Sequence, residues 1–183
     1  MTTRVLFVCT ANVVRSPIAA ELLKLRVQDV DPDVVVESAG LREAQRLLDD
    51  GALGALDGHG VDLRPHRSRR LDAAMVAPAT MVIGLEREHA REAVLLDPSA
   101  WPRTFTLKEI VRRGEAIGSR QPGESIEAWI GRVHADRTQR DLLGSDPIDD
   151  IADPYGGPPG EYEEAAEEID DLVTRLVQLV WPR

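Results

Sequence analysis

The residues with the clearest capacity for chemistry lie near the start of the chain, in the stretch CTANVVRSP. Cys9 is the only cysteine among the 183 residues, and five residues separate it from Arg15. A thiolate is a strong nucleophile, and the planar guanidinium of an arginine matches two oxygens of a phosphate group. The pair and its spacing therefore indicate phosphoryl transfer, with Cys9 attacking phosphorus and Arg15 gripping the phosphate.

The segment between these two residues is suited to hold an anion. Backbone N–H groups of a loop that enters a helix can turn inward, and the helix N-terminus favours negative charge. The same field stabilises the thiolate of Cys9, and Ser16 can donate a hydrogen bond to the sulfur. Asn12 is one of the few non-glycine residues that tolerates positive φ in a tight loop. We therefore predict a phosphate-binding loop made of Thr10, Ala11, Asn12, Val13, Val14, Arg15 and Ser16.

The alternative interpretation is that Cys9 is only a small buried apolar residue, which is the commoner role of a lone cysteine. Arginine and serine would fall at these two offsets from a cysteine by chance about once in two hundred cases. The strand–loop–helix context that a phosphate loop needs is also predicted here. We therefore interpret Cys9 as catalytic.

The elements around this loop predict an α/β fold. Residues 4–9 form a short β-branched apolar run, typical of a buried strand in a parallel sheet. Pro17 opens a predicted helix that runs to about residue 30. Further strands are predicted at 33–38, 81–85 and 94–96, and a charged helix at 86–92. Together they favour a three-layer α/β/α fold with a central, mostly parallel four-stranded sheet and the phosphate loop between strand 1 and helix 1.

The rest of the chain is expected to complete a single domain over residues 1–183. Residues 41–60 are predicted to form a loop with one short helix, and residues 104–145 a helical insertion with helices near 107–117 and 125–137. Residues 146–160 are a loop rich in proline, glycine and aspartate. A strongly amphipathic helix is predicted from about 161 to 180.

Composition excludes several classes of protein. The net charge of −10 and the pI near 4.9 argue against a nucleic-acid partner, which usually needs a basic face. No apolar run approaches the roughly 20 residues that a membrane helix needs, and the N-terminus lacks the features of a signal peptide. We therefore expect a cytoplasmic protein without membrane contact. One cysteine permits no internal disulfide and no cysteine-rich zinc site, and we expect no metal and no cofactor.

The segment 8–23, VCTANVVRSPIAAELL, resembles the phosphate loop of the low-molecular-weight protein tyrosine phosphatase family. The similarity continues in the motifs ESAG at 37–40, HRSRRL at 66–71 and DPYGG at 153–157. Four motifs in the same order over nearly the whole chain make a specific match, and only residues 104–145 look longer than the family's usual core. The resemblance implies hydrolysis of phosphomonoesters, with phosphotyrosine in proteins as the first candidate, through a cysteinyl-phosphate intermediate.

The resemblance also implies roles for residues outside the loop. Asp153 looks like the family's general acid, although an Asp-Pro pair is also common in plain turns. Asp146 precedes a proline too, but Ile148 follows where the family has an aromatic residue. Ser38 and His66 look like hydrogen-bonding partners of Asn12. A basic cluster could steer phosphorylated substrates, but it is interpreted mainly as a solvated helix face: Arg64, His66, Arg67, Arg69 and Arg70. The remaining histidines are interpreted as surface residues: His59, His89 and His134.

The chain departs from the family's pattern at two positions of the loop, Ala11 and Val14. Ala11 stands where the family usually has glycine. Val14 replaces a second cysteine of many members, so no protective disulfide with Cys9 can form, and oxidised Cys9 would need an external thiol for repair. Val13 is aliphatic, as in tyrosine-type members, whereas members acting on phosphoarginine have threonine there. Val13 and Tyr155 are expected to line the substrate cleft, with Tyr155 the only aromatic residue that can be placed at its mouth.

Three alternatives to a phosphotyrosine phosphatase stay open at this point. The same fold can reduce arsenate and pass it to a small-molecule thiol, it can hydrolyse phosphoarginine, or it can bind phosphate without catalysis. Asp153 favours a phosphatase, because an alkoxide leaving group needs an acid. A phosphorylated protein or a small phosphomonoester is the expected partner, and the sequence leaves the oligomeric state open.

Overall fold

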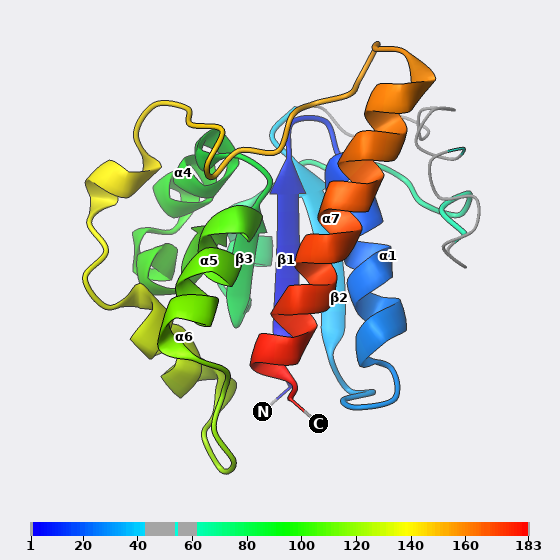
Figure 1. Cartoon of the computed structure of the whole chain (residues 1–183). Helices are drawn as coiled ribbons and strands as arrows, with labels where there is room; N and C mark the ends of the chain where they lie inside the picture. Colours follow the sequence, from blue (N-terminus) through cyan, green and yellow to red (C-terminus); the bar gives the residue numbers. More distant parts are fainter. Residues whose placement is uncertain (1, 43–53, 55–61, 183) are drawn as a thin grey trace.

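Four parallel strands form the central sheet, in the order β2-β1-β3-β4 (Figure 1). They are β1 Arg4–Cys9, β2 Val35–Gly40, β3 Met81–Gly84 and β4 Thr104–Thr106. Every pairing is parallel, so the carboxyl ends of all strands lie at one edge, where ligands bind in sheets of this kind. The predicted fold class is confirmed. The computed structural model describes residues 2–42, 54 and 62–182, and most of the loop predicted at 41–60 lies outside them.

Helices cover both faces of the sheet. They are α1 Arg15–Val27, α3 Ala73–Val76, α4 Arg87–Leu96, α5 Leu107–Ile117, α6 Ile126–His134 and α7 Pro159–Val180, with short 3-10 helices at Pro98–Arg103 and Gln139–Leu142. Side chains of β1 alternate between the two faces, as the pleat requires. Val5 and Phe7 pack with α1, α5 and α7, whereas Leu6 and Val8 pack with α3 and α4. This alternation makes the three layers.

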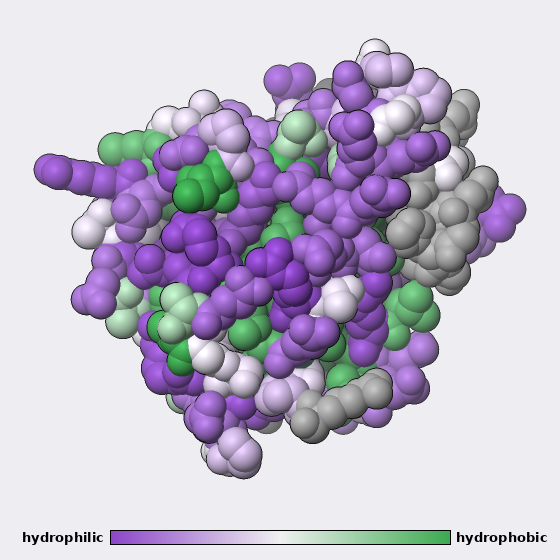
Figure 2. Space-filling model, viewed as in Figure 1, coloured by the Kyte–Doolittle hydropathy of each residue, from purple (hydrophilic) through white to green (hydrophobic). Residues whose placement is uncertain are grey.

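The closing helix α7 shows how burial shapes these elements. Its apolar residues recur three or four positions apart, so they form one stripe that faces α1, α5 and the sheet. Ile169, Val173 and Leu176 are fully buried. The opposite surface of α5 and α7 is largely hydrophilic, as Figure 2 shows. The stripe fixes α7 beside α1, which begins at the phosphate loop.

The fourth strand is not where the sequence predicted it. Residues 94–96 are the last turn of α4, in which Ala90 and Ala93 are buried while Leu95 and Leu96 point to solvent. The apolar run AVLL is therefore the end of a helix, which packs on the sheet through its small alanine side chains. The edge strand is Thr104–Thr106 instead, a three-residue element anchored by the buried Phe105.

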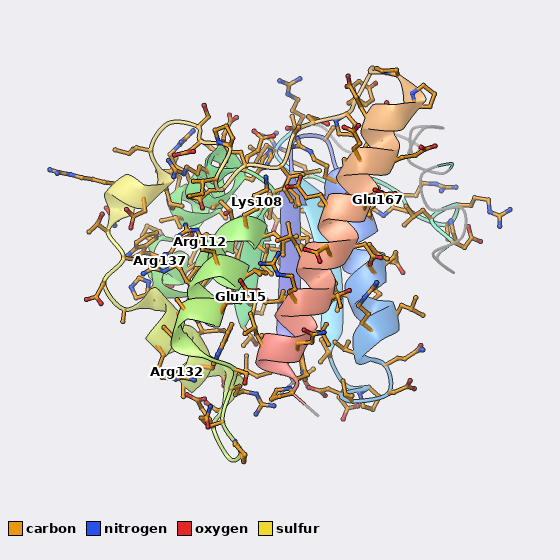
Figure 3. All side chains as sticks on the ribbon, viewed as in Figure 1. Lys108, Arg112, Glu115, Arg132, Arg137 and Glu167 are labelled. Atoms are coloured by element: carbon orange, nitrogen blue, oxygen red, sulfur yellow. The ribbon has the colours of Figure 1, made fainter. Side chains whose placement is uncertain are left out.

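The segment 104–145 was predicted to be a helical insertion, and the structure gives it a mixed role. It supplies β4 as well as α5 and α6, and α5 packs against α7. Arg137 holds its interior together, because its guanidinium donates to the buried Glu109 and lies over the rings of Trp101 and Phe105. Figure 3 shows Arg137 among these helices. Among the described residues, no helix is both long and apolar enough to cross a membrane.

Candidate active site

The predicted phosphate loop starts where β1 ends and finishes where α1 begins. Cys9 is the last residue of β1, and Arg15 is the first residue of α1. The first turn of a helix leaves its N–H groups without intrahelical acceptors, and here those groups belong to the loop itself. The Sγ of Cys9 accepts the N–H of Asn12 at 3.2 Å and lies 3.0 Å from the Oγ of Ser16. Cys9 therefore sits in a polar environment, and not only among aliphatic side chains.

Asn12 ties the loop to two other parts of the chain. Its side-chain Nδ2 donates to the Oγ of Ser16 at 3.0 Å and of Ser38 at 2.9 Å, and its Oδ1 accepts the N–H of Arg69 at 3.0 Å. The carbonyl oxygen of Asn12 only accepts, so His66 donates to it through Nε2 at 2.9 Å. Burial lowers the pKa of His66, which favours this neutral ring. The structure thus brings Ser38 and His66 to Asn12, where the sequence placed them.

The loop conformation explains both an expected residue and an unexpected one. Asn12 adopts a φ of +55°, and among the residues 2–42, 54 and 62–182 only Asp136 is another non-glycine residue with positive φ. Ala11 needs no such conformation, so alanine replaces the family's glycine without backbone strain. Gly40 carries the close approach instead: a Cβ there would lie 2.8 Å from backbone atoms of Ala11 and Asn12. The end of β2 can lie against the loop only because this residue is glycine.

Arg15 is the most deeply buried charged residue near the cleft. Its side chain is 1% exposed, and its guanidinium donates to four acceptors: a carboxylate oxygen of Glu86, the carbonyl of Ile151 at 2.7 Å, the hydroxyl of Thr10 at 3.3 Å and the carboxylate of Asp153 at 2.7 Å. Buried charges persist only when they are paired and hydrogen-bonded, and Arg15 meets both conditions. These contacts hold the planar fork in a fixed orientation in the cleft.

The segment that carries Asp153 is held by a cluster of ion pairs. Arg87 of α4 binds the carboxylate of Asp149 at 2.7 Å, and its N–H donates to Asp150 at 2.7 Å. From α5, Arg112 reaches Asp149 at 2.8 Å and Lys108 reaches the carbonyl of Asp150 at 2.8 Å; both side chains are labelled in Figure 3. The N–H of Ile151 donates to the carbonyl of Leu85 just after β3. These contacts place Asp153 beside Arg15.

Asp146, which also precedes a proline, has a different role. Asp146 lies on the outer side of this cluster, 3.4 Å from the guanidinium of Arg87, and its N–H donates to Asp150. It does not line the cleft, whereas Asp153 does. The two Asp-Pro pairs look alike in sequence, but only the one in the family motif lies at the cleft.

His89 is fully buried beneath the loop, which corrects the prediction that it is a surface residue. Its Nε2 lies 3.1 Å from the hydroxyl of Thr10, and its Nδ1 has no hydrogen-bond partner among the described residues. Burial, together with the positive charge of Arg15, lowers the pKa of His89 to about 3. A neutral ring that donates through Nε2 to Thr10 leaves only an acceptor unpaired at Nδ1. Gly84 permits this packing, because a Cβ there would lie 3.1 Å from the Cβ of His89.

The cleft above the loop measures about 530 Å³. Its lining comes from the loop, from the end of β2, from residue 70 and from the segment after residue 152: Cys9, Thr10, Ala11, Val13, Val14, Arg15, Leu41, Arg42, Arg70, Asp153 and Tyr155. Val13 and Tyr155 both belong to this lining. We call the exposed residues Arg42, Arg70 and Tyr155 the cleft rim.

The prediction that the basic cluster at residues 64–70 lies on a helix is wrong. Residues 64–72 form a turn followed by extended chain, and Arg70 forms a parallel bridge with Gly40 at the edge of the sheet. Arg69 points away from the cleft, to Glu37 and the carbonyl of Ser38, whereas Arg70 lines the cleft. Sequence reasoning also missed Glu86, His89 and the Ile151 carbonyl. What these three groups share is their place in the fold, since each follows or faces the carboxyl end of a strand.

The arrangement can bind a phosphate and transfer it. A cysteine sulfur and a buried guanidinium line one cleft, and a half-exposed carboxylate lies at its mouth within 2.7 Å of that guanidinium. These are a nucleophile, an anion holder and a group that can carry a proton. Among the described residues, no cluster of histidine, cysteine or carboxylate side chains could hold a metal ion.

Comparison with known proteins is consistent with this geometry. A family model described as low molecular weight phosphotyrosine protein phosphatase matches residues 4–122. A protein-arginine-phosphatase of Geobacillus stearothermophilus is 32% identical over 96% of this chain and 94% of its own length. The low molecular weight protein-tyrosine-phosphatase Etp of Escherichia coli K12 is 31% identical over 61% of this chain and 73% of its own. A solved structure, the YwlE arginine phosphatase of G. stearothermophilus, superposes with a TM-score of 0.70 at 30% identity, covering 96% of this chain and 91% of that one.

Proposed function

This chain belongs to the low molecular weight phosphotyrosine protein phosphatase family and is a phosphatase, and we propose that it hydrolyses phosphotyrosine in proteins through a phosphoenzyme on Cys9. One observation carries the proposal. The Sγ of Cys9 accepts the Asn12 N–H in a cleft that Arg15 and Asp153 also line. A sulfur in that position can be held as a thiolate while an anion binds above it.

The first half of the reaction forms the phosphoenzyme. The sulfur of Cys9 attacks phosphorus, so an S–P bond forms as the P–O bond to the phenol oxygen breaks. The proton of a protonated Asp153 passes to that oxygen, and the leaving group departs neutral. Arg15 binds two of the transferred group's oxygens, in place of its bonds to Thr10 and Asp153, and offsets the group's negative charge.

The second half regenerates the enzyme. A water molecule attacks phosphorus, Asp153 takes its proton, and the S–P bond breaks to release the sulfur as an anion. The hydroxyl of Ser16, 3.0 Å from the sulfur, can donate to that anion and ease its departure. Asn12 keeps Ser16 in place, because its Nδ2 donates to the same hydroxyl.

Phosphotyrosine is the first candidate because of Val13. This residue lines the cleft and offers only apolar surface, which suits the face of an aromatic ring. Phosphoarginine carries N–H donors on the corresponding atoms, and buried donors need acceptors that a valine cannot supply. Leu41 adds a second apolar side chain to the same lining.

Phosphoarginine is the second candidate, because a relative named protein-arginine-phosphatase matches nearly the whole chain. Comparing kcat/KM for peptides with phosphotyrosine, phosphoarginine or phosphoserine decides between them. We expect the phosphotyrosine peptide to be hydrolysed at least tenfold faster than either other peptide. A preference for phosphoarginine would replace our candidate without changing the mechanism.

Arsenate reduction and simple phosphate binding are tested in the same experiment. Arsenate with glutathione should give no turnover above background, whereas an arsenate reductase would consume both. Hydrolysis of para-nitrophenyl phosphate excludes a protein that only binds. Cellular fractionation tests the cytoplasmic location, which stays a prediction.

A further inference from the structure

Two arginines of the cleft rim differ from nearly all other arginines in the molecule. Most arginines of the described segments form an ion pair with a carboxylate or donate to a backbone carbonyl. The guanidinium groups of Arg42 and Arg70 do neither within residues 2–42, 54 and 62–182. In a chain with 32 acidic residues and a net charge of −10, two cations that line one cleft and have no carboxylate partner among the described residues need an explanation.

The backbones of both residues are fixed against the phosphate loop. The N–H of Arg42 donates to the carbonyl of Thr10 at 2.9 Å. Arg70 is bridged to Gly40, with the Gly40 N–H bound to the carbonyl of Arg69 at 2.9 Å and the Leu71 N–H bound to the Gly40 carbonyl at 2.7 Å. The two side chains therefore start from defined positions beside the phosphate site, although their ends are exposed.

Neighbouring basic residues sharpen the contrast. Arg64 pairs with Asp62, Arg67 donates to the carbonyls of Arg64 and His66, and Arg69 pairs with Glu37. Of the four arginines in this stretch, only Arg70 lines the cleft, and only its guanidinium has no assigned acceptor in the described part of the chain. Within the part of the chain that the structure describes, the arginines that point away from the cleft therefore have acceptors, whereas the guanidinium at the cleft has none.

The charges of the cleft also favour the binding of a second anion. Its lining contains three arginines and one carboxylate, Asp153, which is bound to Arg15. A phosphate group on the substrate occupies Arg15 and the N–H groups of the loop. Arg42 and Arg70 remain for a further anion, and a distant acidic substrate would otherwise be repelled by the net charge of the protein.

We propose that Arg42 and Arg70 form a second anion subsite, which selects phosphorylated segments that carry an acidic group beside the phosphorylated residue. This proposal rests on the proposed phosphatase function and names its substrate class. Carboxylates of Asp or Glu and a second phosphate share the required chemistry. Arginine is suited to both, because its fork can bind either group through two hydrogen bonds.

The test compares three phosphotyrosine peptides of equal length: one with neutral flanks, one with glutamate flanks and one with a neighbouring phosphoserine. The readout is the ratio of kcat/KM for each acidic peptide to that for the neutral peptide. We expect ratios of about ten in the unaltered protein, which is the size of two partly screened ion pairs. They should fall about threefold in Arg42→Ala or Arg70→Ala and to about one in the double variant. The two acidic peptides show which anion is preferred.

Arg140→Ala is the matched control, because Arg140 is exposed, has no assigned side-chain partner in the described residues and lies away from the cleft. This variant should keep the ratio of the unaltered protein. Raising NaCl from low to high concentration should shrink the ratio, since exposed ion pairs are screened.

Failure of this proposal differs from failure of the proposed function. Equal rates for acidic and neutral peptides, or a double variant that keeps the preference, would overturn the subsite. An equal loss for all peptides in the double variant would also overturn it, because the arginines would then hold the reacting phosphate. If the unaltered protein hydrolyses nothing, including para-nitrophenyl phosphate, the proposed function fails. Binding of the same peptides to Cys9→Ser then still tests the subsite, which requires the acidic peptides to bind about tenfold more tightly.

Discussion

Arg15 and Arg70 line the same cleft, yet the protein treats them in opposite ways. Arg15 is 1% exposed, and both terminal nitrogens of its guanidinium donate to acceptors of the protein. Arg70 is exposed and has no assigned acceptor in the described residues. A group that must hold a reacting atom is fixed before the substrate arrives, whereas a group that selects the substrate is left to meet it. The phosphate loop sets the chemistry, and the cleft rim sets the choice of substrate.

The largest effect should come from replacing Arg15 by lysine. An ammonium cannot form the paired hydrogen bonds of a guanidinium, and it would leave Glu86 and the Ile151 carbonyl without their donor. We expect kcat/KM for para-nitrophenyl phosphate to fall about a thousandfold. Arg26→Lys, which changes an arginine paired with Asp170 on α7, should stay within about twofold. A similar loss in both variants would mean that buried and surface arginines are not distinguished by function.

Asp153 lies between the buried phosphate loop and the exposed cleft rim, since its carboxylate is half exposed but bound to Arg15. If it is the general acid, Asp153→Asn should lower kcat/KM, which reports the first half-reaction, about a hundredfold for phenyl phosphate, whose leaving group needs a proton. The loss should be at most about tenfold for para-nitrophenyl phosphate, whose leaving group is stable as an anion.

Asp146→Asn is the matched control for that variant, because it changes the other aspartate that precedes a proline. It should alter neither rate more than about threefold. An equal loss for both leaving groups in Asp153→Asn would make Asp153 a binding residue only.

Asn12 tests how far the loop depends on being held in advance. Asn12→Ala removes bonds to Ser38 and to the N–H of Arg69, and places alanine at a φ of +55°. We expect a loss of about 2–4 kcal/mol in the free energy of unfolding and a decrease of about tenfold in kcat. Ser38→Ala should cost only about 1 kcal/mol, because the Nδ2 of Asn12 keeps its bond to Ser16. Urea unfolding and steady-state kinetics measure both changes.

Much of the fold and of the loop could be predicted because the information is local. Cys9, Asn12 and Arg15 lie within one strand–loop–helix unit, so their spacing alone fixed their neighbourhood. Glu86 and His89 reach the loop only through the pairing of β3 with β1, and the Ile151 carbonyl arrives after a long excursion through α5 and α6. No pattern around residues 86–89 reveals which strand lies next to them. The short β4 was missed for a related reason: three residues are too few for a periodic signal.

A further effect concerns the stability of the folded protein at low pH. The pKa of His89 is lowered from 6.5 to about 3 in the folded protein, so the unfolded chain binds more protons between these values. Stability therefore falls as pH decreases through this window, by at most about 1.4 kcal/mol per pH unit. His89→Gln keeps a donor near Thr10 but does not titrate. Its unfolding free energy should fall less than that of the unaltered protein, by about 2 kcal/mol between pH 7 and pH 4.5. Parallel curves for the two proteins would show that His89 is not held neutral.

The central claim is that the sulfur of Cys9 carries the phosphate during turnover. Rapid quenching with para-nitrophenyl phosphate, followed by mass spectrometry of the peptide that contains residues 4–15, tests it most directly. Our account predicts a burst of nitrophenol that equals the enzyme concentration and one phosphate on Cys9, with neither in Cys9→Ala. Full turnover by Cys9→Ala, or phosphate found on another residue, would contradict it.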